Sequence, residues 1–375
     1  MQKDFNMRVL LVSPTDPKKP GNLKFLVGGE NTYTQTLLDH PPRGVSYIYY
    51  MDAAKKGGIE YTFTHKILEW LVKLRVLPLS AGSRVFRVVD DYDLIHCHGY
   101  SIKVIGKKIP IVLSDSSSNF IFLRDYINWP MWRIKLGLTL KKFLFEILGV
   151  IDPDTNIKGA KKLIVFSKFA YNIHLSLGAL RSKMVVIPPG LPKIKRKPVK
   201  KHKGISILFV GTWFERKGGP MLLDSFKQLK EKYPGIGLTI VGSVPKKYDL
   251  TGVIHEKFVP RKKILKDYFP RADIFVLIPP VVEGYGFVLL EAASFGIPAI
   301  VTNVCALSEV IENGKTGFVI NPWDQEGLNK RLEKLINNAA LRFKMSENAK
   351  KKFENEFLIE KSNQKLLQIY RRALG

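Results

Sequence analysis

The sequence predicts an α/β protein made of two doubly wound domains, each with a parallel sheet covered by helices. Short apolar runs alternate with longer helix-like segments along most of the 375 residues, a pattern typical of parallel sheets with helical crossovers. The turn cluster Pro188–Pro192 and the charged run Lys193–Lys203 interrupt this alternation near the middle of the chain. Because a chain of this length can bury two separate cores, we expect one domain on each side of the interruption.

Both halves supply strands and helices in the order that such domains need. The expected strands of the first half are Val9–Val12, Val45–Tyr50, Leu94–His98, Ile109–Leu113 and Leu163–Phe166, with a helix over Asn31–Asp39. In the second half the expected strands are Ile205–Val210, Leu238–Val241, Val253–Phe258, Ile274–Ile278, Ala299–Val301 and Gly317–Ile320. The helices expected between them are Met221–Tyr233, Lys262–Phe269, Phe287–Phe295 and Gln325–Asn338. A long helical pattern from Asn348 to Leu374 ends the chain.

These elements place the first domain over residues 1–192, a basic linker over 193–203 and the second domain over 204–354. A charged, proline-broken run such as the linker cannot bury enough surface to fold, although its lysines could instead bind an acidic partner. The helical tail over residues 355–375 packs either on the second domain or back on the first.

Composition narrows the class of protein. An apolar fraction of 45% with 11% aromatic residues indicates a folded globular chain. Cys97 and Cys305 are the only cysteines, so no disulfide framework is available and a reducing compartment is expected. No run approaches the roughly 18 apolar residues of a spanning helix, and Met1–Arg8 lacks the apolar core of a signal peptide. We expect a cytoplasmic protein.

Positive charge is concentrated in the first half of the chain. The formal net charge is +27, and residues 1–203 hold 34 Lys and Arg against 15 Asp and Glu. An excess of this size implies an acidic partner, which could be an anionic lipid surface, nucleic acid or a phosphate-bearing substrate.

The stretch Glu283–Glu291 carries the clearest chemical signal. Two carboxylates flank a glycine turn, Gly284-Tyr285-Gly286, which leads into an apolar helix. A helix start presents backbone N–H groups at the positive end of the helix dipole, where a phosphate can bind, and carboxylates accept hydrogen bonds from sugar hydroxyls. The stretch therefore suggests a site for a sugar attached to a diphosphate. A chance combination of glycine and glutamate before an ordinary helix is the alternative.

Several segments together resemble a known family. They are Gly28–Asn31, Asp93–His98, Phe209–Gly218, Glu283–Glu291 and Asn303–Asn321. In this order they are similar to the family 4 retaining glycosyltransferases, over nearly the whole chain and most strongly over residues 205–325. The resemblance implies a GT-B fold, in which two Rossmann-like domains face each other across a cleft. It also implies that the second domain binds the nucleotide sugar, that the first supplies the acceptor site and that the C-terminal helix returns to the first domain.

The resemblance assigns the donor site residue by residue. Lys217 would offset the charge that develops on the leaving diphosphate, and Arg216 would replace the arginine that relatives carry where this chain has Thr212. Glu283 would contact hydroxyls of the transferred sugar, and Glu291 would bind the ribose. The other donor-binding residues would be Gly28 and Gly29 from the first domain and Gly211, Gly284, Tyr285, Gly286, Phe287 and Val288 from the second. The alternatives are a loop-capping Lys217, a plain turn at Gly28-Gly29 and a structural Glu291.

The acceptor site is expected in the first domain. His96 and His98 share one face of a strand because Cys97 points the other way. A two-histidine metal site would need a third ligand, and none is obvious nearby, so we expect both histidines to line the acceptor cleft without a metal. Many relatives carry a cleft histidine near the position of Ser116, where this chain offers Asp115 and Ser116 instead.

The segment Met131–Val150 predicts a helix with two apolar faces. One holds Trp132, Leu136, Leu140, Phe143, Leu144, Ile147 and Leu148, and the other holds Ile134, Leu138 and Phe145 among Lys135, Lys141 and Lys142. An ordinary surface helix has one apolar face. Two such faces with lysines suggest docking on a lipid surface, and burial between other elements or at a subunit interface is the alternative.

Taken together, the sequence predicts a retaining glycosyltransferase that moves a sugar from a nucleotide-diphosphate sugar, linked to UDP or GDP, to an acceptor hydroxyl. The acceptor would be a glycan or a lipid-linked sugar, the protein would sit peripherally on an anionic membrane surface, and neither a cofactor nor a metal is expected. One alternative is a GT-B sugar phosphorylase or epimerase. Another is a nucleic-acid-binding protein that uses the basic first half, although no nucleic-acid motif is recognisable.

Overall fold

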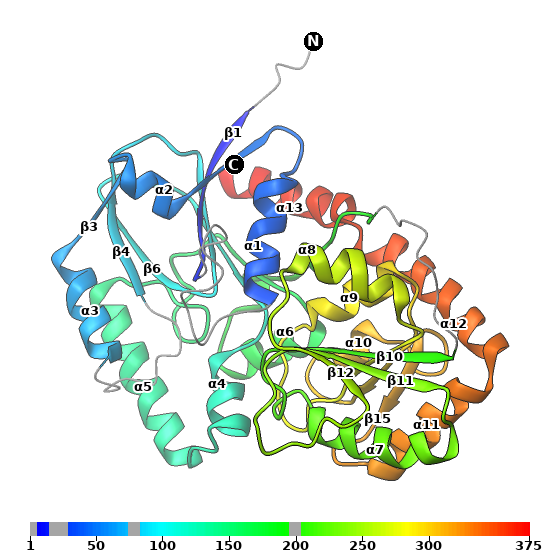
Figure 1. Ribbon diagram of the computed structural model, residues 1–375. Coiled ribbons are helices and arrows are strands. Elements are labelled where there is room, and N and C mark those ends of the chain that lie inside the picture. The colour runs from blue at the N-terminus through cyan, green and yellow to red at the C-terminus, as the bar shows by residue number, and fades with distance from the viewer. Residues whose placement is uncertain (1–5, 15–28, 74–82, 195–203) are drawn as a thin grey trace. The chain divides into compact units, whose positions relative to one another are not determined.

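The computed structural model describes residues 6–14, 29–73, 83–194 and 204–375 (Figure 1). The chain forms two compact units, the first from Met1–Gly190 with Ile359–Gly375 and the second from Leu191–Leu358. It therefore leaves the first unit after Gly190 and re-enters it at Ile359. The backbone N–H of Leu191 donates to the carbonyl of Phe357 at 2.8 Å, so the two crossing segments run side by side. Most of the expected basic linker, from residue 195 to 203, lies outside the described residues.

The main sheet of the first unit is parallel throughout and has the strand order β2-β1-β5-β7-β8-β9. Its strands are β1 (Met7–Val12), β2 (Val45–Tyr49), β5 (Leu94–His98), β7 (Ile111–Asp115), β8 (Lys162–Val165) and β9 (Met184–Val186). The helices α1 (Gly29–Asp39), α6 (Lys168–Ser176) and α13 (Ile359–Leu374) accompany it, together with the short helical segments α4 (Asn119–Ile121), η1 (Phe122–Tyr126) and η2 (Arg181–Lys183). Strand β7 ends two residues later than the sequence suggested, which places Asp115 at the carboxyl edge of the sheet.

A second, three-stranded sheet in the first unit was not predicted. It consists of β3 (Ile59–Tyr61), β4 (Ser83–Val88) and β6 (Ser101–Ile105) in the order β3-β4-β6. These strands could not be recognised as apolar runs because they are short and carry charged side chains such as Arg84, Arg87 and Lys103. The helices α2 (Tyr50–Lys55), α3 (Phe63–Lys73) and α5 (Met131–Leu148) belong to the same region (Figure 1).

The buried face of α5 contains a lysine that the sequence placed among basic surface residues. Lys141 and Asp152 are each 2% exposed in their side chains, and their charged atoms lie 2.8 Å apart. The Ser101 hydroxyl also donates to Asp152 Oδ2 at 2.6 Å. A buried ammonium needs such a partner because an unpaired charge in the interior is costly. Lys141 is therefore structural and not available to a membrane.

The second unit is a doubly wound domain around one parallel sheet with the order β12-β11-β10-β13-β14-β15. The strands are β10 (Ile205–Val210), β11 (Ile236–Val241), β12 (Val253–Glu256), β13 (Ile274–Leu277), β14 (Ala299–Thr302) and β15 (Gly317–Ile320). The helices are α7 (Gly219–Lys232), α9 (Phe287–Ser294), α10 (Leu307–Val310), α11 (Gln325–Asn337) and α12 (Ala339–Lys352). The strand order reverses direction between β10 and β13, and in such sheets ligands bind at the carboxyl ends of the strands beside the reversal.

Two helix predictions were wrong in their extent. The expected helix Lys262–Phe269 consists of three short segments, α8 (Arg261–Lys263), η3 (Ile264–Tyr268) and η4 (Phe269–Arg271). The expected helix Asn348–Leu374 is interrupted, because α12 continues into η5 (Phe353–Phe357) and the chain becomes extended at Leu358, with φ −67° and ψ 138°. That extended residue pairs with Leu191, so the break lies where the chain passes between the units.

Candidate functional site

The loop after β10 holds Lys217 in place through two glycines. A Cβ on Gly211 would lie 2.4 Å from Cδ of Lys217, so the lysine stem lies directly over this glycine. Gly218 has φ +81°, and a Cβ there would lie 2.1 Å from the carbonyl oxygen of Ile278. The backbone N–H of Ile278, at the end of β13, donates to the carbonyl of Lys217 at 3.3 Å. The two loops at the sheet reversal are thus packed directly on each other.

Glu283 lies between the two predicted cations. Its Oε2 is 3.3 Å from Lys217 Nζ and 3.2 Å from Arg216 Nη1, and Arg216 also donates to the carbonyl of Val282 at 2.9 Å. Burial raises the pKa of the Glu283 carboxyl, but Lys217 and Arg216 outweigh burial and hold the pKa below its ordinary value. The carboxylate is therefore ionised at neutral pH and fixes both cations at one point.

The glycine turn beside Glu283 starts α9 in the way an anion site requires. Gly286 caps the helix in the left-handed conformation with φ +74°, which glycine adopts without strain. The first turn of a helix presents backbone N–H groups at its N-terminal end. Gly284 is half-buried, and burial of the neighbouring Tyr285 ring raises the pKa of its phenol. The phosphate site that the sequence predicts lies at this helix start.

Glu291, one turn further along α9, has a partner that sequence reasoning missed. Arg261 at the start of α8 places its Nε 2.5 Å from Glu291 Oε1. Glu291 is 6% exposed, so the guanidinium satisfies a carboxylate that would otherwise be costly to bury. The two residues are 30 positions apart, and only the basic run Arg261-Lys262-Lys263 hinted at a cation near an acidic partner.

The glycine under Lys217 gives a first test of this arrangement. We expect Gly211→Ala to lower the transfer activity that the resemblance implies at least about ten-fold, because the new methyl group displaces the lysine stem and displacements near 1 Å are costly in catalysis. The free energy of unfolding should change by less than about 1 kcal/mol, since a flexible side chain can move aside. Urea unfolding and turnover of the same preparation measure both effects.

Gly218→Ala is the contrasting variant. Its Cβ would collide with backbone, and its φ is positive, so it should lose about 1–3 kcal/mol of stability. For the first variant, wild-type turnover of Gly211→Ala would show that the position of the Lys217 stem does not affect turnover.

In the first unit, two of the four predicted acceptor residues, His98 and Ser116, contact Glu30. Gly28 lies outside the described residues, and Gly29 begins α1. Ser116 Oγ donates to Glu30 Oε1 at 2.7 Å, and His98 Nε2 forms an ion pair with Glu30 Oε2. Burial raises the pKa of Glu30, but the nearby His98 outweighs it, so the pKa of this carboxyl falls below its ordinary value. Glu30 was missed as a site residue, although it directly follows the two glycines.

His96 and His98 are both fully buried. Both contact the Ser114 hydroxyl at 2.8 Å, and His96 Nδ1 lies 2.6 Å from the hydroxyl of Tyr370 on α13. His98 Nδ1 donates to the carbonyl of Ser114 at 3.2 Å, because a carbonyl can only accept. Burial lowers the pKa of His96 to about 3, so this imidazole is neutral. Of the two histidines, His98 contacts Glu30, and the half-buried Ser116 and Glu30 are the groups that reach the surface.

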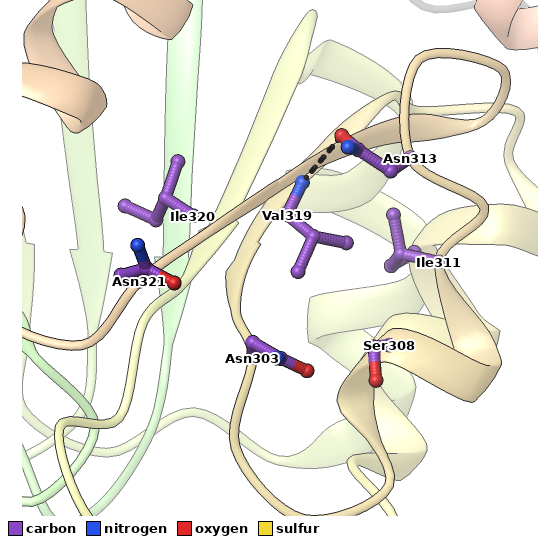
Figure 2. Close-up of a pocket in the computed structure, with 7 residues that line it drawn as sticks. All are labelled: Asn303, Ser308, Ile311, Asn313, Val319, Ile320 and Asn321. Carbon is purple, nitrogen blue, oxygen red and sulfur yellow. Dashed lines mark hydrogen bonds between the residues drawn. The ribbon is translucent and has the colours of Figure 1, made fainter.

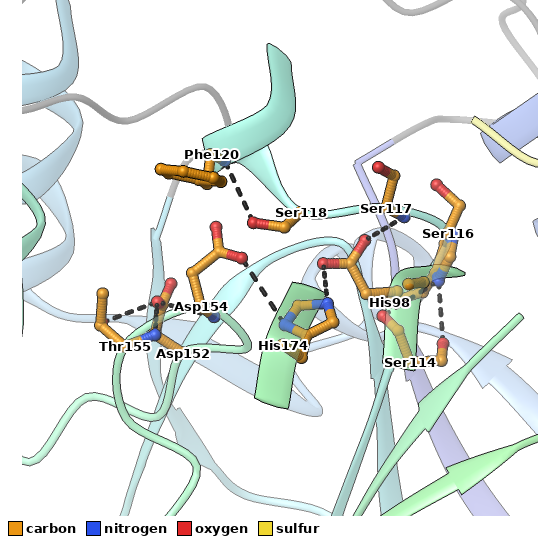
Figure 3. Close-up of polar contacts among 12 residues, drawn as sticks. His98, Ser114, Ser116, Ser117, Ser118, Phe120, Asp152, Asp154, Thr155 and His174 are labelled. Atoms are coloured by element: carbon orange, nitrogen blue, oxygen red, sulfur yellow. Dashed lines mark hydrogen bonds and ion pairs between the residues drawn. The ribbon is translucent and has the colours of Figure 1, made fainter. Parts of the chain in front are cut away.

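Asp115 takes part in a separate buried cluster with His174 and Asp154, and Figure 3 labels these last two residues. Asp115 Oδ2 lies 3.5 Å from His174 Nε2, while His174 Nδ1 lies 3.7 Å from Asp154 Oδ1. Among the described residues these three could surround a metal ion. However, the two ring nitrogens face different carboxylates, and one ion cannot lie on both nitrogen lone pairs. The geometry fits an imidazolium between two aspartates better than a metal centre.

The His174 cluster predicts a dependence of stability on pH. Burial lowers the pKa of His174, but Asp115 and Asp154 outweigh burial and hold it above its ordinary value of 6.5. A raised folded pKa gives stability that is complete below 6.5 and is lost as pH rises through the folded pKa. We expect His174→Gln to remove this slope in urea unfolding measured below and above that pH. An unchanged slope would show that His174 is neutral in the fold.

Three asparagines and a serine line a hollow at the carboxyl ends of β14 and β15 (Figure 2). Asn303 and Asn321 directly follow the two strands, Ser308 lies on α10, and the backbone N–H of Val319 donates to Asn313 Oδ1 at 3.0 Å. Neutral amides and a hydroxyl can both donate to and accept from sugar hydroxyls. The hollow lies along the same sheet edge as the Glu283 loop, which was not foreseen from the sequence.

Two parallel-sheet α/β units with a phosphate-binding helix start beside the strand reversal define the GT-B class of glycosyltransferases. A similar fold occurs in sucrose-phosphate synthase from Thermosynechococcus elongatus, with a TM-score of 0.68 and 15% identity over 98% of both chains. The Anabaena protein HepE, solved with UDP and glucose, gives a TM-score of 0.62 and 14% identity over 96% of this chain and 98% of that one. At these identities the likeness establishes the fold, and the GT-B prediction is confirmed.

Residues 192–352 match the model of the family described as glycosyl transferases group 1. This segment is less than half of the chain, and its match confirms the resemblance to group 1 glycosyltransferases drawn from the motifs. The capsular polysaccharide biosynthesis glycosyltransferase CapM of Staphylococcus aureus is 30% identical over 157 residues, which are 40% of this chain and 41% of CapM. The chain thus matches less than half the length of that relative.

Proposed function

We propose that the protein transfers a sugar from a nucleotide-diphosphate sugar to an acceptor hydroxyl, with retention at the anomeric carbon. The observation that carries this proposal is Glu283 held between Lys217 and Arg216 beside the start of α9. Two cations and a helix N-terminus suit a diphosphate. A fixed carboxylate between them suits the hydroxyls of the attached sugar.

In this proposal the second unit supplies most of the donor site. The diphosphate lies against the N–H groups of Gly286, Phe287 and Val288, and Lys217 and Arg216 stabilise the negative charge that develops as the bond to the sugar breaks. The attacking hydroxyl approaches on the same face as the leaving phosphate, which accepts its proton. No side chain of the protein then acts as nucleophile, and no metal or cofactor is required.

Glu291 binds the ribose hydroxyls, and Arg261 orients it. The ion pair leaves one carboxylate oxygen of Glu291 for a ligand, since only Oε1 is bound to the arginine. UDP and GDP sugars are both compatible with this arrangement, because none of these contacts involves the base.

The first unit contributes the acceptor site around Glu30 and Ser116. We place the acceptor, a glycan or a lipid-linked sugar, at an anionic membrane surface, because the net charge of +27 needs an acidic partner. Among the residues that the structure describes, no helix is long and apolar enough to cross a bilayer.

The test is thermal stabilisation by UDP, GDP, ADP, their common sugar conjugates and a short oligonucleotide, followed by turnover with the nucleotide sugar that binds. A ligand at 100 times its dissociation constant should add about 2.7 kcal/mol of stability. Stabilisation by one nucleotide family and release of nucleoside diphosphate only with an acceptor support a transferase. Release of sugar phosphate would favour a phosphorylase, and stabilisation by the oligonucleotide alone would replace the proposal with nucleic-acid binding.

A further inference from the structure

Two helices of the first unit expose an unusual share of large apolar side chains. Nine of the twenty large apolar side chains that are exposed in the described part of the chain lie on α3 and α5. They are Phe63, Ile67 and Trp70 on α3, and Met131, Trp132, Leu136, Leu140, Phe143 and Ile147 on α5. Soluble proteins seldom gather exposed apolar side chains in this way unless the surface has a partner.

The exposed side chains form one stripe on each helix. On α5 the intervals between Trp132, Leu136, Leu140, Phe143 and Ile147 are four, four, three and four residues, which keeps them on one helical face. Ile134 and Phe145, both 0% exposed, lie on the opposite face. On α3 the intervals between Phe63, Ile67 and Trp70 are four and three, and the buried Leu68 lies across the helix.

Both helices are anchored in the same small core. Leu68 of α3 and Phe145 of α5 pack with Val85 and Val150 in one buried cluster, and Figure 1 shows the two helices together beside β3, β4 and β6. Because each stripe lies opposite the face that enters this cluster, both stripes point away from the core. One apolar face of the segment 131–150 is therefore buried between other elements, which was the alternative to membrane docking. The second apolar face stays exposed.

The charges beside the stripes favour an anionic partner. Arg133, Lys135 and Lys142 are exposed on α5, and Lys66 is exposed on α3. The acidic residues of the two helices are already paired: Glu146 lies 3.1 Å from Lys158, and Glu69 lies 3.1 Å from Arg84. Flanking lysines and arginines each contribute about 1 kcal/mol near anionic lipid. A second copy of this basic surface would instead bring like charges together.

We propose that the α3–α5 face docks the protein on an anionic bilayer, with the apolar stripes in the headgroup region. Tryptophan prefers this depth because its ring is amphipathic. With 18 residues, α5 is about 27 Å long and can lie flat along the surface. Docking needs no nucleotide sugar, so this inference does not depend on the proposed transferase activity.

The experiment is co-sedimentation with vesicles of phosphatidylcholine containing about one third phosphatidylglycerol, compared with phosphatidylcholine alone. We expect the full chain to bind the anionic vesicles, and to bind less as salt rises from about 0.1 M to about 1 M, because salt shortens the screening length. The double variant Trp132→Ser/Phe143→Ser should lose at least about ten-fold in partitioning.

The matched control is Trp323→Ser/Phe343→Ser, which removes the same two residue types from the second unit. Trp323 and Phe343 are 73% and 70% exposed, against 68% and 65% for Trp132 and Phe143. This control should bind vesicles as the wild type does. The proposal is overturned if the wild type does not bind anionic vesicles, or if both double variants lose binding equally. It is also overturned if the wild type forms a dimer that does not bind lipid and that becomes a monomer only in the α5 variant.

Discussion

Replacing Lys217 with alanine should lower the turnover of sugar transfer about 100- to 1000-fold, the loss seen when one fixed donor to a developing negative charge is removed. The lysine is placed by Gly211 under its stem and by Glu283 at its tip, so its ammonium is positioned before the donor arrives. Arg216 remains in Lys217→Ala and should leave a residual rate. Turnover with saturating nucleotide sugar and acceptor measures the effect.

Lys247→Ala is the control for this variant. Lys247 is also in the second unit, but its side chain is 66% exposed and pairs with Glu215 at 2.6 Å, so its removal should leave turnover unchanged. The thermal shift given by the nucleoside diphosphate should fall in Lys217→Ala and persist in Lys247→Ala. If Lys217→Ala keeps wild-type turnover and wild-type nucleotide binding, the diphosphate does not lie at this loop.

The parts of the site that the sequence predicted are those that are contiguous in the chain. Glu283, the glycine turn and the helix start at Phe287 lie within nine residues, so local turn and capping rules apply directly to them. The apolar runs also located the strands of both main sheets except the short edge strand β9, because buried parallel strands are continuously apolar. The extended break at Leu358 was missed because the helical pattern on either side of it continues through the sequence.

Partners that are distant in the chain could not be predicted in the same way. Glu291 was expected to find a ligand because it seemed unpaired, yet Arg261 reaches it across 30 residues. His96 was expected to line the acceptor site, yet a tyrosine 274 positions later holds it inside the first unit. Such contacts depend on how α8 and α13 pack, and tertiary packing leaves no local signature in a single sequence. Glu30 is the exception, since its position after Gly28-Gly29 offered a local clue.

Glu283→Gln should lose turnover, as Lys217→Ala does, but should keep its binding of nucleoside diphosphate. Glutamine keeps the shape of the side chain but not its charge, so the contact to the sugar hydroxyls weakens and turnover should fall at least about 100-fold. Lys217 and Arg216 then lack their shared carboxylate and are free to bind phosphate. The nucleoside diphosphate alone should therefore bind at least as tightly as it does to the wild type, while Lys217→Ala binds it more weakly.

The stability of Glu283→Gln should also depend on the ligand and on pH. Without ligand, two cations face each other around a buried neutral side chain, and the variant should lose about 3 kcal/mol, the cost of breaking a buried ion pair. Nucleoside diphosphate should restore that loss. In the wild type the pKa of Glu283 is below its ordinary value of 4.5, so its contribution to stability is present above pH 4.5 and is lost as pH falls through the folded pKa. The variant should lack this loss of stability at acid pH. If Glu283→Gln loses nucleoside diphosphate binding together with turnover, the carboxylate organises the phosphate site and does not contact the sugar.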